Sequence, residues 1–194
     1  MAEPLIDEKE LVRQLKKGNE SAFAHVYGRY QAPIYRFALH MSGNAATAEE
    51  VTQEVFMLMI SKPGGFDPAK GSLAGYLFGI ARNLTRRSLQ KSMRDIPLEQ
   101  DEDQPGFDES VLAADFDILQ DLSQAESFEQ LRKAVLALPE QYREAVVVCE
   151  LEELSYSDAA AILQCSQGTL ASRLNRAKAM LRTRLLHQRS VRLR

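Results

Sequence analysis

The chain has 194 residues, of which 45% are hydrophobic and 26% are charged, and its formal net charge is −3. These values are typical of a globular protein with one or two domains, and they exclude a chain that is disordered throughout or fibrous. No stretch approaches the ~20 apolar residues that a membrane span requires, and the first ten residues are acidic where a signal peptide would be basic and then apolar. We therefore expect a cytoplasmic protein that does not insert into a membrane.

Cysteine and histidine are sparse. Cys149, Cys165 and three scattered histidines form neither a metal-ligand cluster nor a disulfide framework, so both cysteines are predicted to be reduced, packed thiols. The sequence also lacks a Ser/His/Asp set, a phosphate-cradling glycine loop and a pair of catalytic carboxylates. We expect no metal, no cofactor and no enzymatic activity.

The charges are strongly segregated along the chain. Residues 1–94 hold 13 basic and 9 acidic side chains, residues 95–129 hold 0 and 12, and residues 130–194 hold 11 and 6. Two basic runs, 70–94 and 167–194, contain no acidic residue. Two basic bodies joined by an acidic segment favour a polyanionic partner, although each run alone is also compatible with an ordinary solvated helix face.

Helical periodicity extends over most of the chain, which predicts an all-α fold. A first pair of helices breaks near Gly18 and Asn19, and Pro33 predicts an interruption of the second. Another helix is expected over 47–60, followed by a stretch of breakers over 61–68. Ser72 is suited to cap a further helix that ends near Lys91.

The acidic segment contains Pro97, Pro105 and Gly106 and is predicted to be a linker. A second domain then begins, with helices over about 126–137 and from Pro139 onward. Residues 155–158 resemble a capping box for a short helix over 156–163. A turn follows, and Ser166 is suited to cap a last helix from 167 to about 185. This order predicts a helix-turn-helix.

The last helix has two different faces. Leu170, Leu174, Ala177 and Leu181 recur at helical spacing and are expected to face the core. The opposite side carries small polar residues and arginines, which suits the major groove of DNA, where arginine can bond guanine in pairs. Later basic residues, Lys178 first among them, are better placed for phosphates. The alternative is a helical hairpin with a basic, solvated face.

The helix over 72–91 also has a polar half, which carries Asn83, Arg86, Arg87 and Gln90. Tyr76 lies at its edge, and the preceding loop contains Phe66 and Lys70. Basic residues with aromatics and amides nearby favour binding of single-stranded DNA, because an unstacked base offers a π-face and a free hydrogen-bonding edge. Phe66 and Tyr76 could equally be core aromatics.

The helix over 47–60 carries an acidic stripe where the two helices above carry basic residues. Glu50, Gln53, Glu54 and Met57 recur at i, i+3, i+4 and i+7 and form an acidic stripe with an apolar end. Such a stripe repels DNA and suits docking of a basic protein helix. An ordinary solvated face would show the same spacing.

Four stretches in this order resemble the bacterial extracytoplasmic-function sigma factors, the two-domain initiation subunits of RNA polymerase. They run from Leu11-Val12 to Arg29-Tyr30, from Ala48 to Phe56 (AEEVTQEVF), from Phe66 through Tyr76-Leu77 to Leu84, and from Leu138-Pro139 to Arg176-Ala177. The resemblance implies sigma region 2, a helical bundle, over 1–94. It further implies an acidic flexible linker over 95–127 and sigma region 4, with its helix-turn-helix, over 128–194.

The resemblance also implies roles for single residues. The acidic stripe would bind the clamp helices of the largest polymerase subunit through Glu50, Gln53, Glu54 and Met57. The −10 element would be recognised and melted by Phe66, Lys70, Tyr76, Arg82, Asn83, Arg86, Arg87 and Gln90. The −35 element would be recognised by Ser166, Thr169, Ser172, Arg173, Arg176 and Lys178.

The implied partners are core RNA polymerase, including its flap near −35, promoter DNA as duplex and melted strand, and an anti-sigma factor. The acidic linker would thread through basic channels of the polymerase. Tyr76 stands where many members have tryptophan, and Ala171 where relatives often carry a basic residue, so promoter preference does not transfer from them. Two other functions remain open from the residues: a stand-alone helix-turn-helix regulator using 130–194, and a helical adaptor for an acidic protein.

Overall fold

The computed structural model describes residues 8–62, 64–94 and 124–192, and these residues are helices joined by turns. The helices are α1 (Glu8–Lys16), α2 (Glu20–Ser42), α3 (Ala45–Ser61), α4 (Leu73–Arg94), α5 (Gln124–Leu136), α6 (Glu140–Val146), the π-helical η2 (Val147–Leu151), α7 (Tyr156–Ile162) and α8 (Gln167–Arg192). The predicted all-α fold is confirmed. Most of the expected acidic linker lies outside the described residues, and α5 begins within its C-terminal end.

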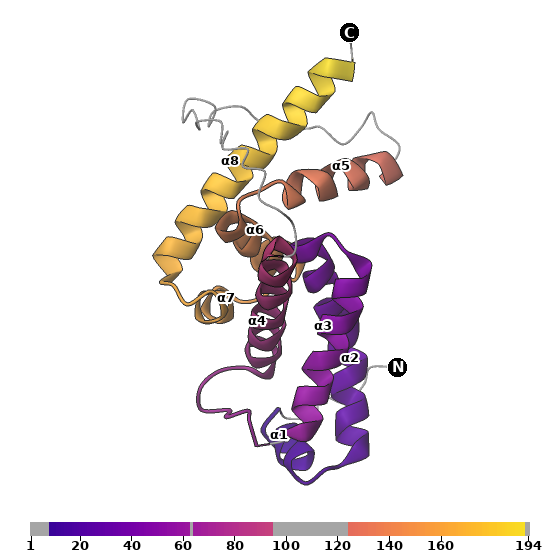
Figure 1. Cartoon of the computed structure of the whole chain (residues 1–194). Helices are drawn as coiled ribbons and strands as arrows, with labels where there is room; N and C mark the ends of the chain where they lie inside the picture. Colours follow the sequence, from indigo (N-terminus) through magenta and orange to yellow (C-terminus); the bar gives the residue numbers. More distant parts are fainter. Residues whose placement is uncertain (1–7, 63, 95–123, 193–194) are drawn as a thin grey trace.

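The first four helices form one bundle, in which α2, α3 and α4 pack on one another and α1 packs on α2 (Figure 1). Local signals set their ends. The Asn19 side chain accepts hydrogen bonds from the backbone N–H groups of Ser21 and Ala22, and Gly43 ends α2 at a φ of 70° that favours glycine. Fully buried side chains, including Val26, Ile34, Phe37, Leu77 and Phe78, fill the space between the helices.

The interruption expected at Pro33 was wrong, since α2 continues through this residue from Glu20 to Ser42. Proline removes one backbone hydrogen bond and costs about 3 kcal/mol inside a helix. Val26 before it and Ile34 and Phe37 after it are all fully buried. Their burial, at about 1.5–3 kcal/mol each, is sufficient to keep both halves in one helix.

The last helices form a second bundle, in which α5, α6 and α7 pack against α8. Both predicted caps are present: Ser155 Oγ accepts from Asp158 N at 3.0 Å, and Ser166 Oγ accepts from Thr169 N at 3.1 Å. Leu170, Leu174, Ala177 and Leu181 are buried, as the spacing predicted. Two features differ from expectation. The helix α8 extends to Arg192 instead of ending near residue 185, and the η2 turn follows α6 without a break.

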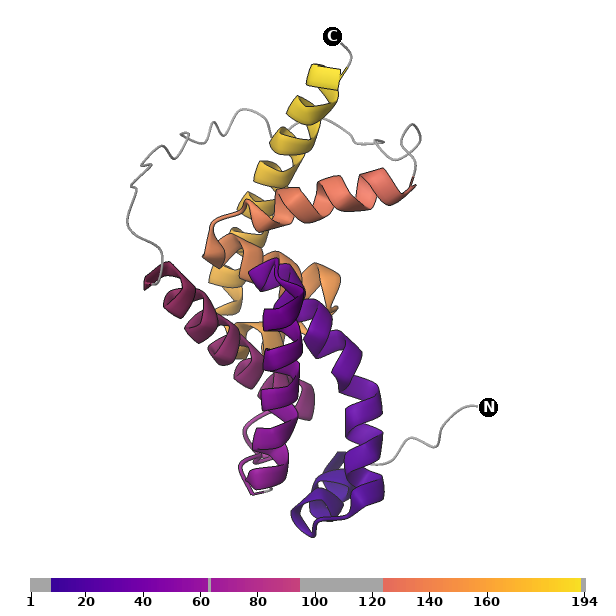
Figure 2. The same ribbon diagram turned by 45° about the vertical axis from the view of Figure 1, so that its right-hand side comes forward.

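The two bundles touch each other. The helix α4 packs against α7, while α2 packs against α5, α6 and η2 (Figures 1 and 2). Within the described part of the chain, no helix combines the length and the apolar character needed to cross a membrane.

Candidate functional site

The acidic stripe of α3 lies on the surface. Glu50, Gln53 and Glu54 are all exposed, and Met57 keeps 57% of its surface accessible. Val51 and Val55 point the other way, into the core. The structure therefore brings the four predicted polymerase-binding residues onto one open face of the first bundle.

A shallow groove lies between α2 and α3 beside this stripe and is lined by Gln53 and Met57 of it; its apolar side was not predicted. Tyr27 from α2 is 42% exposed and packs against Phe56 from α3, with ring centroids 4.8 Å apart and planes tilted by 58°. Ile60 is 55% exposed at the same groove. Tyr27 has the helical spacing of a buried position, so the sequence pattern alone does not indicate this exposed ring. Exposed apolar side chains beside carboxylates are typical of a protein-binding surface.

The helix α4 presents Asn83, Arg87 and Gln90 to solvent, and Lys70 in the preceding loop is also exposed. Ser72 caps this helix by accepting a hydrogen bond from Gly75 N at 3.0 Å. These four predicted −10 residues are thus accessible around one end and one side of α4.

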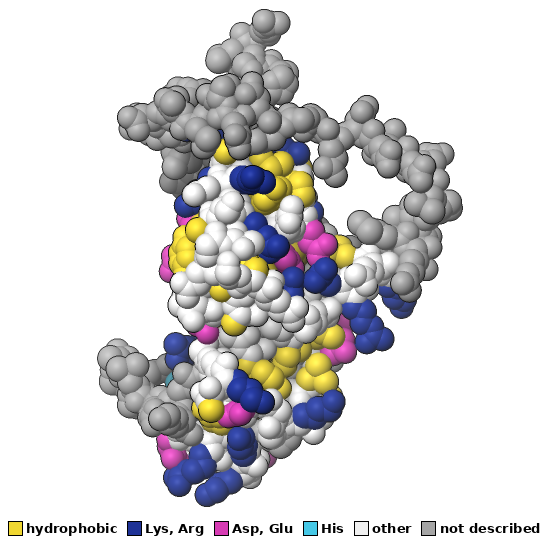
Figure 3. All heavy atoms as spheres, turned by 90° about the vertical axis from the view of Figure 1, so that its left-hand side faces the viewer, with side chains coloured by type: hydrophobic (Ala, Val, Ile, Leu, Met, Phe, Trp, Pro, Cys, Tyr) yellow, Lys and Arg dark blue, Asp and Glu magenta, His cyan; other side chains and the backbone are white. Residues whose placement is uncertain are grey.

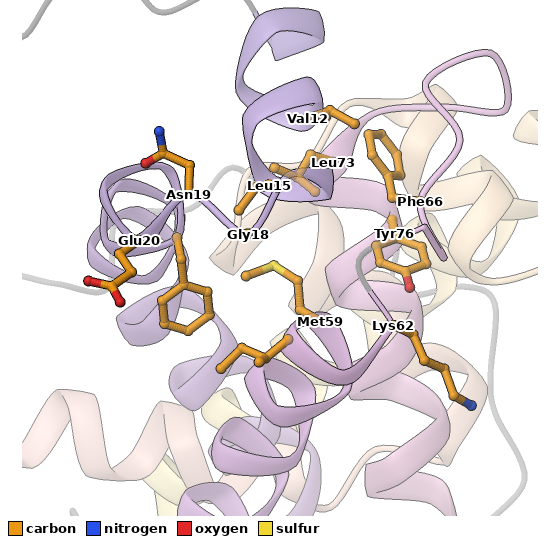
Figure 4. Close-up of a pocket in the computed structure, with 12 residues that line it drawn as sticks. Val12, Leu15, Gly18, Asn19, Glu20, Met59, Lys62, Phe66, Leu73 and Tyr76 are labelled. Atoms are coloured by element: carbon orange, nitrogen blue, oxygen red, sulfur yellow. The ribbon is translucent and has the colours of Figure 1, made fainter.

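The two aromatic candidates are less accessible. Phe66 is 7% exposed and lies against the half-buried Tyr76, with ring centroids 5.4 Å apart. Both border an apolar pocket of about 230 Å³ between α1, the N-terminus of α2, the end of α3 and the start of α4. Figure 4 shows Phe66 beside Tyr76, with Met59 inside the pocket and the Lys62 amine pointing away. In this conformation Phe66 packs as a core aromatic, and Tyr76 keeps a partly open edge.

Two other −10 candidates on α4 are engaged by the second bundle. Arg82 is 6% exposed and is bound by Glu144 from α6, with Nε 2.6 Å from Oε1. Arg86 is half-buried, and its Nε lies 2.7 Å from Oε1 of Glu140. Sequence reasoning identified both arginines but not their carboxylate partners.

The N-terminal half of α8 carries the predicted −35 residues on its solvent side. Thr169, Ser172 and Arg176 are exposed and Arg173 is half-buried. With Gln141 and Tyr142 of α6, which sequence reasoning missed, they line an open hollow. Ser166 is occupied as the helix cap, and its hydroxyl is 2.9 Å from that of Thr169.

Lys178 lies two residues beyond Arg176 on α8 and is exposed, with its Nζ 3.0 Å from Glu150 Oε1. Figure 3, which views the side of Figure 1 where α7 and α8 lie, shows lysine and arginine side chains on both the upper and the lower part of that face. Cys149 and Cys165 are free thiols, and burial is the main cause that raises the pKa of Cys149.

Comparison with known families gives two matches. The family model for sigma-70 region 2 matches residues 26–95, and the model for sigma-70 region 4 matches residues 128–181. Together they cover more than half of the chain and include the α4 and α8 surfaces described above.

Whole-chain relatives agree with these models. The chain is 30% identical to the extracytoplasmic-function (ECF) sigma factor SigW of Bacillus subtilis over 91% of its own length and 96% of the relative's. It is 35% identical to the ECF sigma factor EcfG of Rhodopseudomonas palustris over 75% of each chain.

Solved structures show the same fold. The sigma factor RpoE of Bartonella quintana, solved in complex with the anti-sigma factor NepR, aligns with a TM-score of 0.65 and 26% identity over 84% of this chain and 96% of that chain. CnrH, solved in complex with the cytosolic domain of CnrY, aligns with a TM-score of 0.67 at 20% identity, over 92% and 96% respectively. Since the relatives span both bundles, these matches favour a sigma factor over a stand-alone helix-turn-helix regulator. The chain belongs to the sigma-70 family as an ECF sigma factor, a subunit that binds core RNA polymerase and directs transcription initiation at selected promoters.

Proposed function

We propose that three surfaces of this chain divide the work of initiation. The groove between α2 and α3 binds core polymerase, the exposed side of α4 with its preceding loop binds the melted −10 strand, and the N-terminal half of α8 enters the −35 duplex. The corresponding units are region 2 over 1–94, a linker over 95–127 and region 4 over 128–194. The chain would act in the cytoplasm and catalyse no reaction of its own.

The observation that carries this proposal is the composite groove between α2 and α3. Gln53 and Met57 of the acidic stripe line it together with exposed Tyr27, and exposed Glu50 and Glu54 lie on α3 next to these two stripe residues. The carboxylates attract a basic helix during association. The aromatic and methionine side chains provide an apolar contact that excludes water at the centre of the interface. We propose the clamp helices of the largest polymerase subunit as the occupant, and co-elution of the chain with purified core polymerase as the test.

The strand-binding role of α4 is tested by replacing Asn83. Asn83→Ala should reduce open-complex formation while leaving closed-complex binding nearly unchanged, because an exposed amide on α4 can hold a base edge only after the strand has opened. Permanganate footprinting reports the first quantity and gel shift at low temperature the second.

A template with a preformed bubble is the control for Asn83. If the amide holds an unpaired base, the variant should bind the bubble more weakly than the wild type does. Equal losses on duplex and bubble templates, at both stages, would contradict strand capture.

The −35 role of α8 is tested by a matched pair of basic residues. Arg176→Ala should weaken binding to a preferred −35 sequence by about 1–3 kcal/mol and reduce discrimination at one base pair, if the guanidinium bonds a base edge. Lys178→Ala should weaken all sequences equally and reduce the salt dependence of binding, because its amine, on a different side of α8 from Arg176, reaches only phosphate. Binding is measured by fluorescence anisotropy at several salt concentrations. If the two variants showed the same sequence and salt dependence, the assignment of Arg176 to a base edge and Lys178 to phosphate would be refuted.

We also propose that an anti-sigma protein controls this chain. The related RpoE structure, which is 26% identical, was solved with an anti-sigma factor bound. The exposed groove of α2 and α3 and the hollow beside α8 are surfaces such a protein could cover.

A further inference from the structure

No proposed contact with polymerase or DNA uses the interior of the apolar pocket beside Phe66 and Tyr76. The pocket has a volume of about 230 Å³ and is formed by α1, the start of α2, the end of α3, and the start of α4 with its preceding loop. Most of the side chains that line it are apolar: Val12, Leu15, Phe23, Met59, Ile60, Phe66, Leu73 and Tyr76. An apolar cavity of about 150 Å³ is already large enough to stay dry and take up benzene. The space in this bundle can therefore hold a small organic molecule.

The pocket combines a buried inner wall with an accessible mouth. Val12, Met59 and Leu73 are 3%, 7% and 2% exposed and form part of the inner wall. Ile60, at 55% exposure, and the exposed Glu20 lie at the mouth. A small molecule can therefore enter from solvent and contact buried apolar side chains.

The polar groups around the pocket favour a neutral occupant. The Glu20 carboxylate and the Lys62 amine point away from the cavity (Figure 4). The Asn19 side-chain oxygen is occupied as the cap of α2, and the Tyr76 hydroxyl lies so close to Gly65 that a Cβ atom there would be 2.6 Å from it. Among the described lining residues, no charged group is thus available to pair with a buried charge on a ligand, and an unpaired buried charge is very costly.

The apolar groups further favour an aromatic occupant. Rings from three separate elements line the pocket: Phe23 of α2, Phe66 of the loop and Tyr76 of α4. Met59 adds a thioether inside the pocket (Figure 4). Aromatic rings attract one another edge to face or offset, and a methionine sulfur interacts favourably with a ring. We infer that this cavity binds a small, neutral, aromatic molecule of one or two fused rings.

The position of the cavity gives such a ligand access to two surfaces. Phe23 and Ile60 also line the groove between α2 and α3, and Phe66 and Tyr76 also line the groove beside Asn83. A bound molecule would contact all four side chains and restrain α1, the end of α3 and the loop over 64–72 together. Binding itself is a property of the free chain and does not depend on the roles proposed for these grooves.

Toluene and benzoate are the probes for this site. They share a ring with a one-carbon substituent and differ in charge. Toluene at about five times its Kd should raise the Tm of the full chain by roughly 2–4 °C in scanning calorimetry, because a ligand that binds only the folded state stabilises it. Benzoate at the same concentration should leave the Tm unchanged. No shift with toluene, or an equal shift with benzoate, would overturn the inference.

A matched pair of variants locates the binding. Leu15 is half-buried and lines the pocket, so Leu15→Trp should fill the space and abolish the toluene shift. Leu131→Trp makes the same replacement at a 37% exposed leucine on α5 and should retain the shift. Both variants should show the helical circular dichroism of the wild type without ligand. A full toluene shift in Leu15→Trp would contradict binding in this cavity.

Hydrogen exchange of the wild type locates the site without any substitution. Toluene should slow exchange of the amides in 8–20, 56–62 and 64–76 by up to about sixfold at the same concentration, because local opening of these segments must release the ligand. Exchange in α8 should not change, since α8 does not line the pocket. Slowing spread evenly over both bundles, or confined to the second, would refute the assigned site.

Discussion

Reversing both glutamates of the α3 stripe, Glu50→Lys with Glu54→Lys, should abolish stable binding to core polymerase. Both carboxylates are exposed, so the change leaves the core of the bundle untouched. Placing two ammonium groups against a basic partner helix costs several kcal/mol by like-charge repulsion, and each 1.4 kcal/mol is a tenfold change in Kd. Size-exclusion co-elution with core enzyme, and titration of labelled sigma factor, measure the loss.

A second double charge reversal, elsewhere on the surface, distinguishes loss of the binding site from a change in total charge. Glu20 of α2 and Glu129 of α5 are also exposed and lie outside the α3 stripe, and Glu20→Lys with Glu129→Lys changes net charge by the same amount. This control should retain polymerase binding, and both variants should show the helical circular dichroism of the wild type. Undiminished co-elution of the Glu50 and Glu54 variant would remove the stripe from the polymerase contact.

Helix ends and core stripes could be predicted because their causes are local in sequence. Ser155 and Ser166 cap helices through groups three residues away. Leu170 and Leu174 are buried because a helix repeats every 3.6 residues. The same reasoning placed Glu50 and Glu54 on the surface, which the structure confirms.

The features that escaped prediction depend on residues far apart in the chain. Arg82 looked like any other member of a basic run, and only the fold reveals Glu144, 62 positions later, as its partner. Tyr27 has the spacing of a core residue, yet it is 42% exposed and packs against the buried Phe56. At Pro33 the local rule that proline interrupts a helix fails, because tertiary packing keeps both halves of α2 in one helix. Local patterns therefore identified the helices and several candidate side chains. Which partners those side chains contact depends on the packing of helices that are far apart in the chain.

The second prediction with a large expected effect concerns the stability of the packing that positions α4. Phe78 of α4 is 2% exposed and meets the fully buried Phe37 of α2 edge to face, with ring centroids 5.6 Å apart and planes at 89°. Phe78→Ala should lower the free energy of unfolding by about 3–5 kcal/mol, through lost burial and the cavity left behind. Urea denaturation followed by circular dichroism measures this loss.

Two comparisons give the Phe78 prediction its specificity. Phe78→Leu retains most of the volume and should lose less stability, and Tyr156→Ala, at a 47% exposed aromatic, should lie within about 0.5 kcal/mol of the wild type. Because α4 also packs on α3, loosening it should weaken polymerase binding and promoter opening together, whereas Asn83→Ala affects opening alone. An unfolding free energy unchanged by Phe78→Ala would show that this aromatic pair does not hold α4 against α2.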